Sequence, residues 1–275
     1  MAMNKLPKNA GVCDGWQTVP LRPCYEVLIP IGRGTQFEDL ITSGVYAGEH
    51  LHSPYRDDNV IDSASPVIYV RQSVAEKLRY AQSLLPQGLK LIIFDGYRSV
   101  EVQRALFDQF LDALRVLRPE YTERQLVEET EHYVALPSAD VMQPSPHSTG
   151  GAVDVAIIKD NIMIEFGTPF DHGSVRSALR YFEDESHVLT DADREAREHR
   201  RLLYRVMMSA GFEGYEYEWW HFNAHETQMG ARAAGLSEAS FGVATMTKST
   251  FYESEKVHSD VDQPSAPIDR IAPTH

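Results

Sequence analysis

His147 and Asp154 are the residues whose types and spacing first suggest chemistry in this sequence. They lie seven positions apart in the stretch SPHSTGGAVDVAI, on either side of Gly150–Gly151. Imidazole and carboxylate groups are ligands of catalytic zinc, and a glycine pair lets the chain turn so that both side chains can face one ion. An unpaired carboxylate inside the apolar run AVDVAII is costly, so Asp154 needs a partner. The stretch therefore predicts two ligands of a zinc site.

A third ligand is expected from the stretch EWWHF, where His221 follows Glu218 by three positions. Catalytic zinc takes three protein ligands and keeps one position open, and a neighbouring carboxylate can act as general base. Residues three apart on a regular strand face opposite sides, so we expect an irregularity near Trp219. Simpler alternatives remain open: a histidine before a glycine turn is often a surface residue, and the aromatic residues here are typical of a core.

Arg98, in the stretch FDGYRS, follows the apolar run LKLIIFD and precedes a predicted helix. Loops at strand ends commonly carry catalytic residues. An arginine at this place could stabilise an oxyanion, or it could anchor the loop through a salt bridge. The residues alone leave both interpretations open.

The elements that would position these residues are mixed in type. Apolar runs and alternation predict strands, and helical spacing predicts helices that include one with Ser99 as N-cap and one ended by Gly211. The expected strands are 24–31, 89–95, 152–158 and 215–222, and the expected helices are 73–85, 99–117, 121–134 and 191–212. The order has no repeated βαβ unit, so it favours an α+β fold over a doubly wound one.

The composition limits the partners and the compartment. The net charge of −14, from 40 acidic and 26 basic residues, makes nucleic acid and anionic membranes poor partners. Cys13 and Cys24 are too few for a disulfide framework, and we expect two free thiols, although one bridge is not excluded. There is neither a signal-like apolar segment at the start nor a long apolar run, which predicts a cytoplasmic protein. The oligomeric state, including a homo-oligomer, stays open.

Three motifs resemble those of one known family. SPHSTGGAVD is similar to the SxHxxGxAxD motif of the zinc D-alanyl-D-alanine dipeptidases, the VanX-type family, and EWWHF is similar to their ExWH motif. DGYR resembles the stretch that carries their catalytic arginine, and GTPFD, ending at Asp171, resembles their substrate-binding segment. The resemblance covers roughly residues 87–223.

The resemblance implies a fold and a set of roles. It implies a single α+β domain with a central, mainly antiparallel sheet flanked by helices, the fold of hedgehog-type and D,D-peptidase domains. His147, Asp154 and His221 would hold one zinc ion per chain. Glu218 would be the general base, and Arg98 would polarise the scissile carbonyl. Ser145 and Asp171 would bind the substrate, a small dipeptide whose free amino group faces Asp171.

The function expected from these motifs is zinc-dependent hydrolysis of a D,D-dipeptide, D-alanyl-D-alanine, to two D-alanines. Two departures bear on specificity: Gly34 stands where the family has an aromatic residue, and the segment after GTPFD keeps Arg176 and Ser177 but lacks the family's acid and histidine. The alternatives are a peptidoglycan D,D-carboxypeptidase, a dipeptidase of broader specificity, and a non-catalytic zinc-binding protein. The presence of Glu218 and Arg98 argues against the last.

The polar composition from Met246 onward predicts a flexible tail. We therefore expect a catalytic domain over residues 1–245 and a tail over residues 246–275.

Overall fold

The computed structural model describes residues 5–24, 26–47, 61, 64–138 and 140–246. Its strands are β1 (Leu28–Ile31), β2 (Ile41–Thr42), β3 (Ile68–Arg71), β4 (Leu89–Asp95), β5 (Ala152–Lys159), β6 (Ile162–Met163), β7 (Phe212–Tyr215) and β8 (Glu218–Ala224). Its α-helices are α1 (Gln72–Ser83), α2 (Val100–Leu117), α3 (Glu123–Glu131), α4 (Asp191–Ser209) and α5 (Gln228–Ala233). Five short 3-10 turns, η1 to η5, are Trp16–Thr18, Val45–Ala47, Pro146–Thr149, Val175–Ser177 and Tyr181–Glu183.

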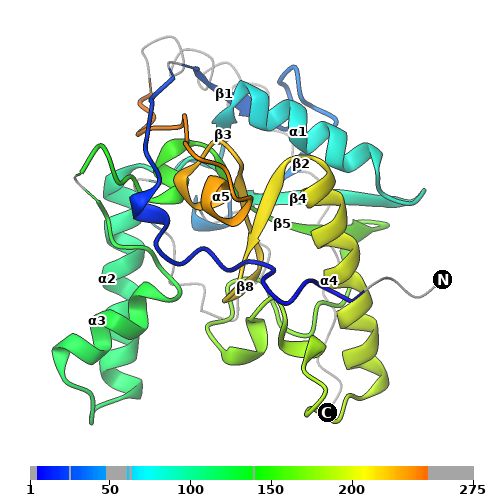
Figure 1. Cartoon of the computed structure of the whole chain (residues 1–275). Helices are drawn as coiled ribbons and strands as arrows, with labels where there is room; N and C mark the ends of the chain where they lie inside the picture. The colour runs from blue at the N-terminus through cyan, green and yellow to red at the C-terminus, as the bar shows by residue number, and fades with distance from the viewer. Residues whose placement is uncertain (1–4, 25, 48–60, 62–63, 139, 247–275) are drawn as a thin grey trace.

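The central sheet has the strand order β2-β4-β5-β8-β7, with β6 paired to β5. The pairs β4–β5, β5–β6, β5–β8 and β7–β8 are antiparallel, and only β2 joins its neighbour β4 in parallel. Strands β1 and β3 form a separate antiparallel pair. The sheet is mainly antiparallel and lies among helices, which confirms the predicted α+β fold (Figure 1).

The helices divide into those that cover the sheet and those that stand apart from it. Leu78 of α1 and Met207 of α4 are fully buried in the same core as the apolar residues of β4 and β5. Helices α2 and α3 instead pack on each other through a smaller cluster around Phe107, and they form a lobe to one side of the sheet (Figure 1). Ser99 caps α2 as predicted, with its hydroxyl accepting a hydrogen bond from Val102 N.

The predicted strand 215–222 is interrupted by a turn at residues 216–217. The aromatic stretch 215–222 is the turn and second arm of a hairpin, because β7 ends at Tyr215 and β8 begins at Glu218. The backbone of Glu216, between them, bonds outward: its N–H donates to Gly11 O, and its carbonyl accepts from Leu179 N. These contacts with distant segments satisfy the backbone groups that a continuous strand would have used. Local alternation could not reveal them.

The expected irregularity near Trp219 is confirmed. Gly214 pairs with Phe222, but the next residue of β7, Tyr215, pairs with Glu218. Gly214 and Tyr215 are adjacent in β7, but their partners in β8 are separated by three residues, 219–221, which have no partner in β7. This bulge places Glu218 and His221 on one side of the sheet, with 4.0 Å between Glu218 Oε2 and His221 Nδ1.

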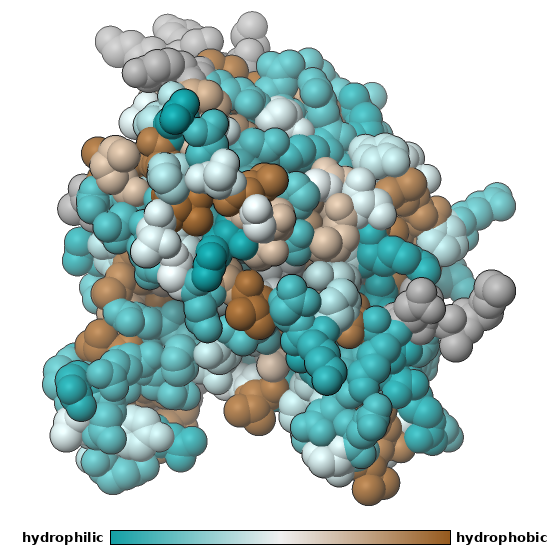
Figure 2. Space-filling model, in the orientation of Figure 1, coloured by the Kyte–Doolittle hydropathy of each residue, from teal (hydrophilic) through white to brown (hydrophobic). Residues whose placement is uncertain are grey.

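The outer surface is largely polar on the face that Figure 2 shows. The face in Figure 2 is mostly hydrophilic, with scattered apolar residues and a notch between the α2–α3 lobe and the side that carries α4. Within the described residues, no helix is long and apolar enough to cross a membrane. Cys13 and Cys24 are both free, as expected. The predicted tail, residues 246–275, lies outside the described residues except for Met246, which packs against the cluster around Leu28.

Candidate metal centre and active site

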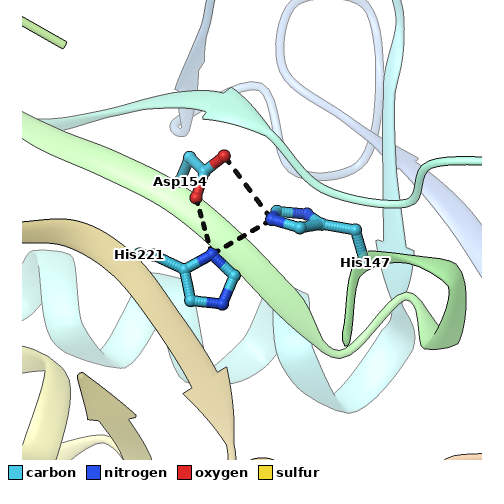
Figure 3. A group of neighbouring side chains, drawn as sticks. All are labelled: His147, Asp154 and His221. Carbon is cyan, nitrogen blue, oxygen red and sulfur yellow. Dashed lines mark hydrogen bonds and ion pairs between the residues drawn. The ribbon is translucent and has the colours of Figure 1, made fainter. Parts of the chain in front are cut away.

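Three separate elements bring the predicted metal ligands together. His147 comes from η3, Asp154 from β5 and His221 from β8, where the sheet register sets Asp154 opposite His221. His147 Nε2 lies 3.1 Å from His221 Nδ1 and 3.5 Å from Asp154 Oδ2, and His221 Nδ1 lies 3.0 Å from Asp154 Oδ1. Figure 3 shows the three side chains converging on one point. Each is more than 90% buried.

The donor atoms suit a zinc ion. His147 Nδ1 lies 2.8 Å from the carbonyl of Gly96, which fixes its hydrogen there and leaves the Nε2 lone pair facing the other two side chains. Three lone-pair-bearing groups thus point at one another, an arrangement that needs a shared proton or cation. Zinc bonds of about 2.0–2.1 Å in a tetrahedron place ligand atoms about 3.4 Å apart, close to the separations found here. Two imidazoles and one carboxylate are also a typical catalytic zinc set.

The glycine pair allows the η3 turn to reach β5. Gly150 has φ +69°, and a Cβ there would lie 2.4 Å from a methyl group of Leu28. A side chain would be strained in this conformation and would also clash, so the position requires glycine. The turn is tied down by Arg71, whose backbone N–H donates to Gly150 O and whose Nε donates to Thr149 O at 2.8 Å. The glycine turn therefore serves the placement of His147.

The electrostatics of the three ligands favour a bound cation. Burial by itself would raise the pKa of Asp154, but His147 and His221 hold that pKa well below its usual value. Burial lowers the pKa of His221, although Asp154 opposes the shift. A charged carboxylate beside a neutral imidazole is the protonation state that metal ligation requires.

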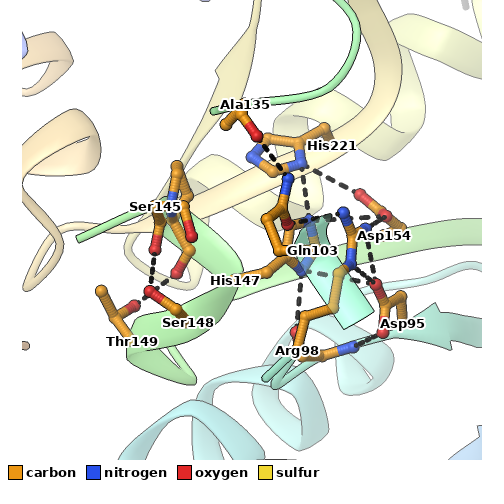
Figure 4. A network of polar contacts seen from close by, with 12 residues as sticks. Asp95, Arg98, Gln103, Ala135, Ser145, His147, Ser148, Thr149, Asp154 and His221 are labelled. Carbon is orange, nitrogen blue, oxygen red and sulfur yellow. Dashed lines mark hydrogen bonds and ion pairs between the residues drawn. The ribbon is translucent and has the colours of Figure 1, made fainter. Parts of the chain in front are cut away.

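Arg98 lies next to Asp154, one of the three predicted ligands. Its Nε and Nη2 lie 2.7 and 2.6 Å from Asp95 Oδ2, and its Nη2 lies 3.4 Å from Asp154 Oδ2 (Figure 4). Nη1 donates to Gln103 Oε1 at 3.0 Å. Burial would lower its pKa, but Asp95, Tyr46 and Asp154 together raise it above the ordinary value. Arg98 is therefore a permanent cation in the site.

Both interpretations of Arg98 from the sequence have structural support. The pairing with Asp95 is the anticipated loop-anchoring salt bridge, and Asp95 is brought opposite Asp154 by a register shift in β4 between Ile93 and Asp95. A guanidinium has five N–H donors. Among the described residues, three hydrogen bonds use the Nε hydrogen, one Nη1 hydrogen and one Nη2 hydrogen, and Nη2 also forms an ion pair with Asp95. The second Nη1 hydrogen has no acceptor among these residues and is available to a substrate carbonyl. Anchoring and oxyanion stabilisation are thus compatible.

Glu218 stands at the start of β8 beside the metal ligands and is 7% exposed. Burial raises its pKa well above the ordinary value, and the negative charges of Asp154 and Asp171 raise it further, while Arg98 acts in the opposite direction. A carboxylate whose pKa is raised is a stronger base than an exposed one, which suits general base catalysis. The geometry is consistent with the base role expected from the sequence.

The two predicted substrate-binding residues both reach the same cavity. Ser145 is the N-cap of η3 and is buried, and its carbonyl accepts from the Ser148 hydroxyl at 2.7 Å. Asp171 is half-buried and adopts φ +59°, a left-handed conformation that is uncommon for a residue other than glycine. Burial raises the pKa of Asp171 to about 7, with further effects from Asp154 and Asp95, while Arg98 and a hydrogen bond from Tyr46 lower it.

The cavity at the metal centre has a volume of about 520 Å³, within the usual range for small-molecule sites. The seven predicted site residues all line it. Its wall also includes residues from α2, from the last residue of α3 and the segment 132–138 that follows it, and from the N-terminal segment. The pocket therefore lies between the α2–α3 lobe and the sheet.

Several site residues were not predicted from the sequence. Tyr46, from η2, places its ring 5.1 Å from Arg98 Cζ and bonds Asp171. Tyr215 packs 5.6 Å from the ring of His221, and its hydroxyl donates to His132 O. Trp220, expected in the core, is buried and also lines the cavity. Gly34 does not line the cavity, so its difference from the family pattern does not act at the pocket wall.

Comparison with known proteins gives a consistent match. The family model Peptidase_M15, D-ala-D-ala dipeptidase, matches residues 40–237. The D-alanyl-D-alanine dipeptidase of Synechocystis sp. is 28% identical over 223 residues, 74% of this chain and 84% of that protein. The D-alanyl-D-alanine dipeptidase of Enterococcus faecalis is 27% identical over 154 residues, 55% of this chain and 70% of that protein. Among solved structures, VanYB in complex with D-alanine-D-alanine aligns with a TM-score of 0.41 and 20% identity, over 64% of this chain and 83% of that one.

The matched range 40–237 spans most of the chain and contains all seven predicted site residues. The chain therefore belongs to the D-ala-D-ala dipeptidase family of zinc metallopeptidases, Peptidase_M15.

Proposed function

We propose that this protein hydrolyses D-alanyl-D-alanine to two D-alanines with one zinc ion held by His147, Asp154 and His221. The observation that carries the proposal is the convergence of these three side chains with Glu218 and Arg98 on one cavity. Within the described part of the chain, this is the only cluster of three or more histidine, cysteine or acidic side chains with metal-ligand spacing, in line with one ion per chain.

The roles follow from where the groups lie. Zinc bound in such a site acts as a Lewis acid on a carbonyl and makes water nucleophilic at neutral pH. Glu218 takes the proton of the attacking water on its carboxylate and passes it to the amide nitrogen of the leaving D-alanine. Arg98 donates its remaining Nη1 hydrogen to the carbonyl oxygen as negative charge develops there. Asp95 and Gln103 hold the guanidinium in position.

We further propose that the catalytic domain spans residues 1–245. The N-terminal segment is joined to the C-terminal one by a parallel bridge between Leu21 and Ala239. Ala244 N donates to Ser148 O at 2.8 Å, so residues near position 244 contact the turn that carries His147. The C-terminal part of this range thus supports the site.

Arg98→Lys is expected to lower kcat by about 10²- to 10³-fold, the usual cost of losing one oxyanion donor. Lysine keeps the positive charge but lacks the planar fork that contacts Asp95, Gln103 and Asp154 together. Steady-state kinetics on D-alanyl-D-alanine measure the effect, and zinc content and thermal unfolding of the same sample detect a structural loss. Arg79→Lys, at an exposed arginine paired with Asp39, is the matched control and should change kcat by less than about twofold. A change confined to KM would assign Arg98 to ground-state binding instead.

A free amino group on the substrate distinguishes a dipeptidase from a carboxypeptidase. If Asp171 pairs with the substrate ammonium, N-acetyl-D-alanyl-D-alanine should be a very poor substrate, because acetylation removes the charge. Asp171→Asn removes the carboxylate, keeps the shape of the side chain, and tolerates the left-handed backbone. It should lower kcat/KM for the free dipeptide by at least about 30-fold and leave the acetylated substrate almost unchanged.

The assay is best run above pH 7, where the Asp171 carboxylate is ionised because its pKa lies at about 7. Equal hydrolysis of free and acetylated D-alanyl-D-alanine by the unmodified protein would contradict the dipeptidase proposal. The carboxypeptidase alternative has some support in the cavity wall, which continues past the metal centre to Phe110 and Pro137. A pentapeptide ending in D-alanyl-D-alanine, as a third substrate, tests that alternative directly.

A further inference from the structure

The segment that carries Asp171 has little regular structure of its own. Between β6 and α4, the segment 164–190 contains only the 3-10 turns η4 and η5. Asp171 nevertheless holds a left-handed backbone conformation, which costs energy for a residue with a side chain. Such a conformation persists only when surrounding contacts impose it. The contacts that do so are candidates for residues that control substrate recognition.

The first of these contacts comes from Arg200 of α4, which is 1% exposed. Its Nε donates to Phe166 O at 2.8 Å, its Nη1 to Ala178 O at 2.7 Å and its Nη2 to Arg176 O at 3.0 Å. Burial, and then the like charge of Arg176, lower the pKa of Arg200 to about 9, so the guanidinium is still charged at neutral pH. One buried cation thus joins the two sides of the segment around Asp171.

The second set of contacts is a buried chain of side-chain hydrogen bonds. Trp219 Nε1 donates to Thr168 Oγ1 at 2.9 Å, Thr168 Oγ1 lies 3.1 Å from Ser177 Oγ, and the Ser177 hydroxyl donates to His172 O. The direction of the chain is fixed, because the tryptophan N–H can only donate and the Ser177 hydrogen is already used. Thr168, Ser177 and Trp219 are all at least 94% buried.

This series of hydrogen bonds joins the two halves of the proposed active site. Trp219 directly follows Glu218 in β8, and His172 directly follows Asp171. The hydrogen bonds therefore run from the strand that carries the base and a metal ligand to the backbone beside the proposed ammonium-binding carboxylate. Because Trp219, Thr168 and Ser177 are buried, breaking one link leaves an unpaired polar group, which favours a shift of the segment.

We propose that Ser177, Thr168 and Arg200 are positioning residues that fix the Asp171 carboxylate at a set distance from the metal centre, and so determine the selectivity for a substrate with a free amino terminus. This inference rests on the proposed pairing of Asp171 with the substrate ammonium. None of the three residues needs to touch the substrate. Their effect is transmitted through the backbone at Asp171 and His172.

The test begins with Ser177→Ala and Thr168→Val, which each remove one hydroxyl from the chain. Each variant is expected to raise KM for D-alanyl-D-alanine about tenfold, to change kcat by less than about twofold, and to leave kcat/KM for the N-acetylated dipeptide unchanged. Thr130→Val is the matched control: it removes a fully buried hydroxyl that donates to Leu126 O in α3, so it should cost similar stability without changing KM. Equal losses on both substrates, or a loss in kcat alone, would overturn the proposal.

A double-mutant cycle separates this inference from the proposed function. If Ser177 acts through Asp171, then Ser177→Ala should have no further effect on KM in the Asp171→Asn background. If Asp171→Asn itself does not distinguish the free from the acetylated dipeptide, the proposed function fails. If Asp171→Asn distinguishes them but the effects of the two substitutions add, only the positioning inference fails.

Arg200→Lys provides a third line of evidence, with Arg71→Lys as its counterpart. Arg71 is also buried and its three nitrogens donate to backbone carbonyls, but these include Thr149 O, in the turn that carries His147. Arg200→Lys should raise KM for the free dipeptide with normal zinc content, whereas Arg71→Lys should weaken zinc retention. If Arg200→Lys lowers zinc retention and leaves KM unchanged, Arg200 does not position Asp171. Should Arg200→Lys fail to fold, the two hydroxyl variants still decide the proposal.

Discussion

His147→Ala is expected to leave the purified protein with far less than one equivalent of zinc and to lower kcat/KM by about 10³-fold or more. The imidazole supplies one of three ligand atoms, and its Nε2 lies 3.1 Å from His221 Nδ1 and 3.5 Å from Asp154 Oδ2. Two remaining ligands do not hold zinc as a catalytic site does. The Lewis-acid contribution of several kcal/mol is lost with the ion, and each 1.36 kcal/mol corresponds to tenfold in rate.

Metal analysis after dialysis measures the first effect, and kinetics on D-alanyl-D-alanine measure the second. His225→Ala is the control, because His225 lies just beyond β8 and pairs with Glu213 rather than with the metal ligands. That variant should keep its zinc and its turnover. Full zinc content in His147→Ala would exclude His147 as a zinc ligand. It would also contradict the proposal that His147, Asp154 and His221 together hold the ion.

The sequence could single out His147, Asp154 and His221, which the structure brings within metal-ligand spacing, because their setting is local and unusual. Asp154 is a carboxylate in an otherwise apolar strand, and the turn at Gly150 requires glycine both for its φ of +69° and for the approach to Leu28. The spacing of Glu218 and His221 was informative for the same reason. Two residues three apart can share a site only across an irregularity, and the strand pairing contains that bulge. In both cases, a residue that did not suit a regular apolar strand indicated where the site lies.

The residues that were missed depend on contacts between distant segments. Tyr46 lies 52 positions before Arg98, and only the fold brings its ring 5.1 Å from the guanidinium. Asp95 is brought opposite Asp154 by a one-residue register shift in β4, which no periodicity encodes. The hairpin at Glu216 was read as one strand because its backbone partners, Gly11 and Leu179, are far away in sequence. Register and long-range pairing are set by tertiary structure, so a single sequence does not reveal them.

Arg98 shows how a sequence can support two interpretations that the structure combines. A charged residue at the end of a buried strand can be either an anchor or a catalytic group. Here the Asp95 pairing holds the guanidinium plane, and Arg98 lines the cavity with one Nη1 hydrogen that has no acceptor among the described residues. Preorganised donors of this kind stabilise developing charge without reorganising during the reaction. The anchor is therefore part of what makes the catalytic role feasible.

Glu218→Gln is expected to retain about one equivalent of zinc and to lower kcat by about 10²- to 10⁴-fold, the range for loss of a general base. Glutamine has nearly the same shape, so the packing at the start of β8 should be preserved. Glu218 is not one of the three converging ligand atoms, and its Oε2 lies 4.0 Å from His221 Nδ1. Zinc content should therefore separate this variant from His147→Ala, in which metal and turnover are lost together.

Turnover by Glu218→Gln should fall with little change in the binding of D-alanyl-D-alanine, because the carboxylate transfers the water proton to the scissile amide during the reaction and is not needed to bind the dipeptide. Burial and the charges of Asp154 and Asp171 raise the pKa of Glu218, which makes its carboxylate a stronger base than an exposed glutamate. Glutamine cannot accept that proton at any pH. Glu218→Asp keeps a carboxylate but withdraws it by about one methylene, so it should recover part of the lost kcat. Near-normal kcat in Glu218→Gln, measured in zinc-replete protein, would exclude Glu218 as the base and require another proton acceptor in the cavity.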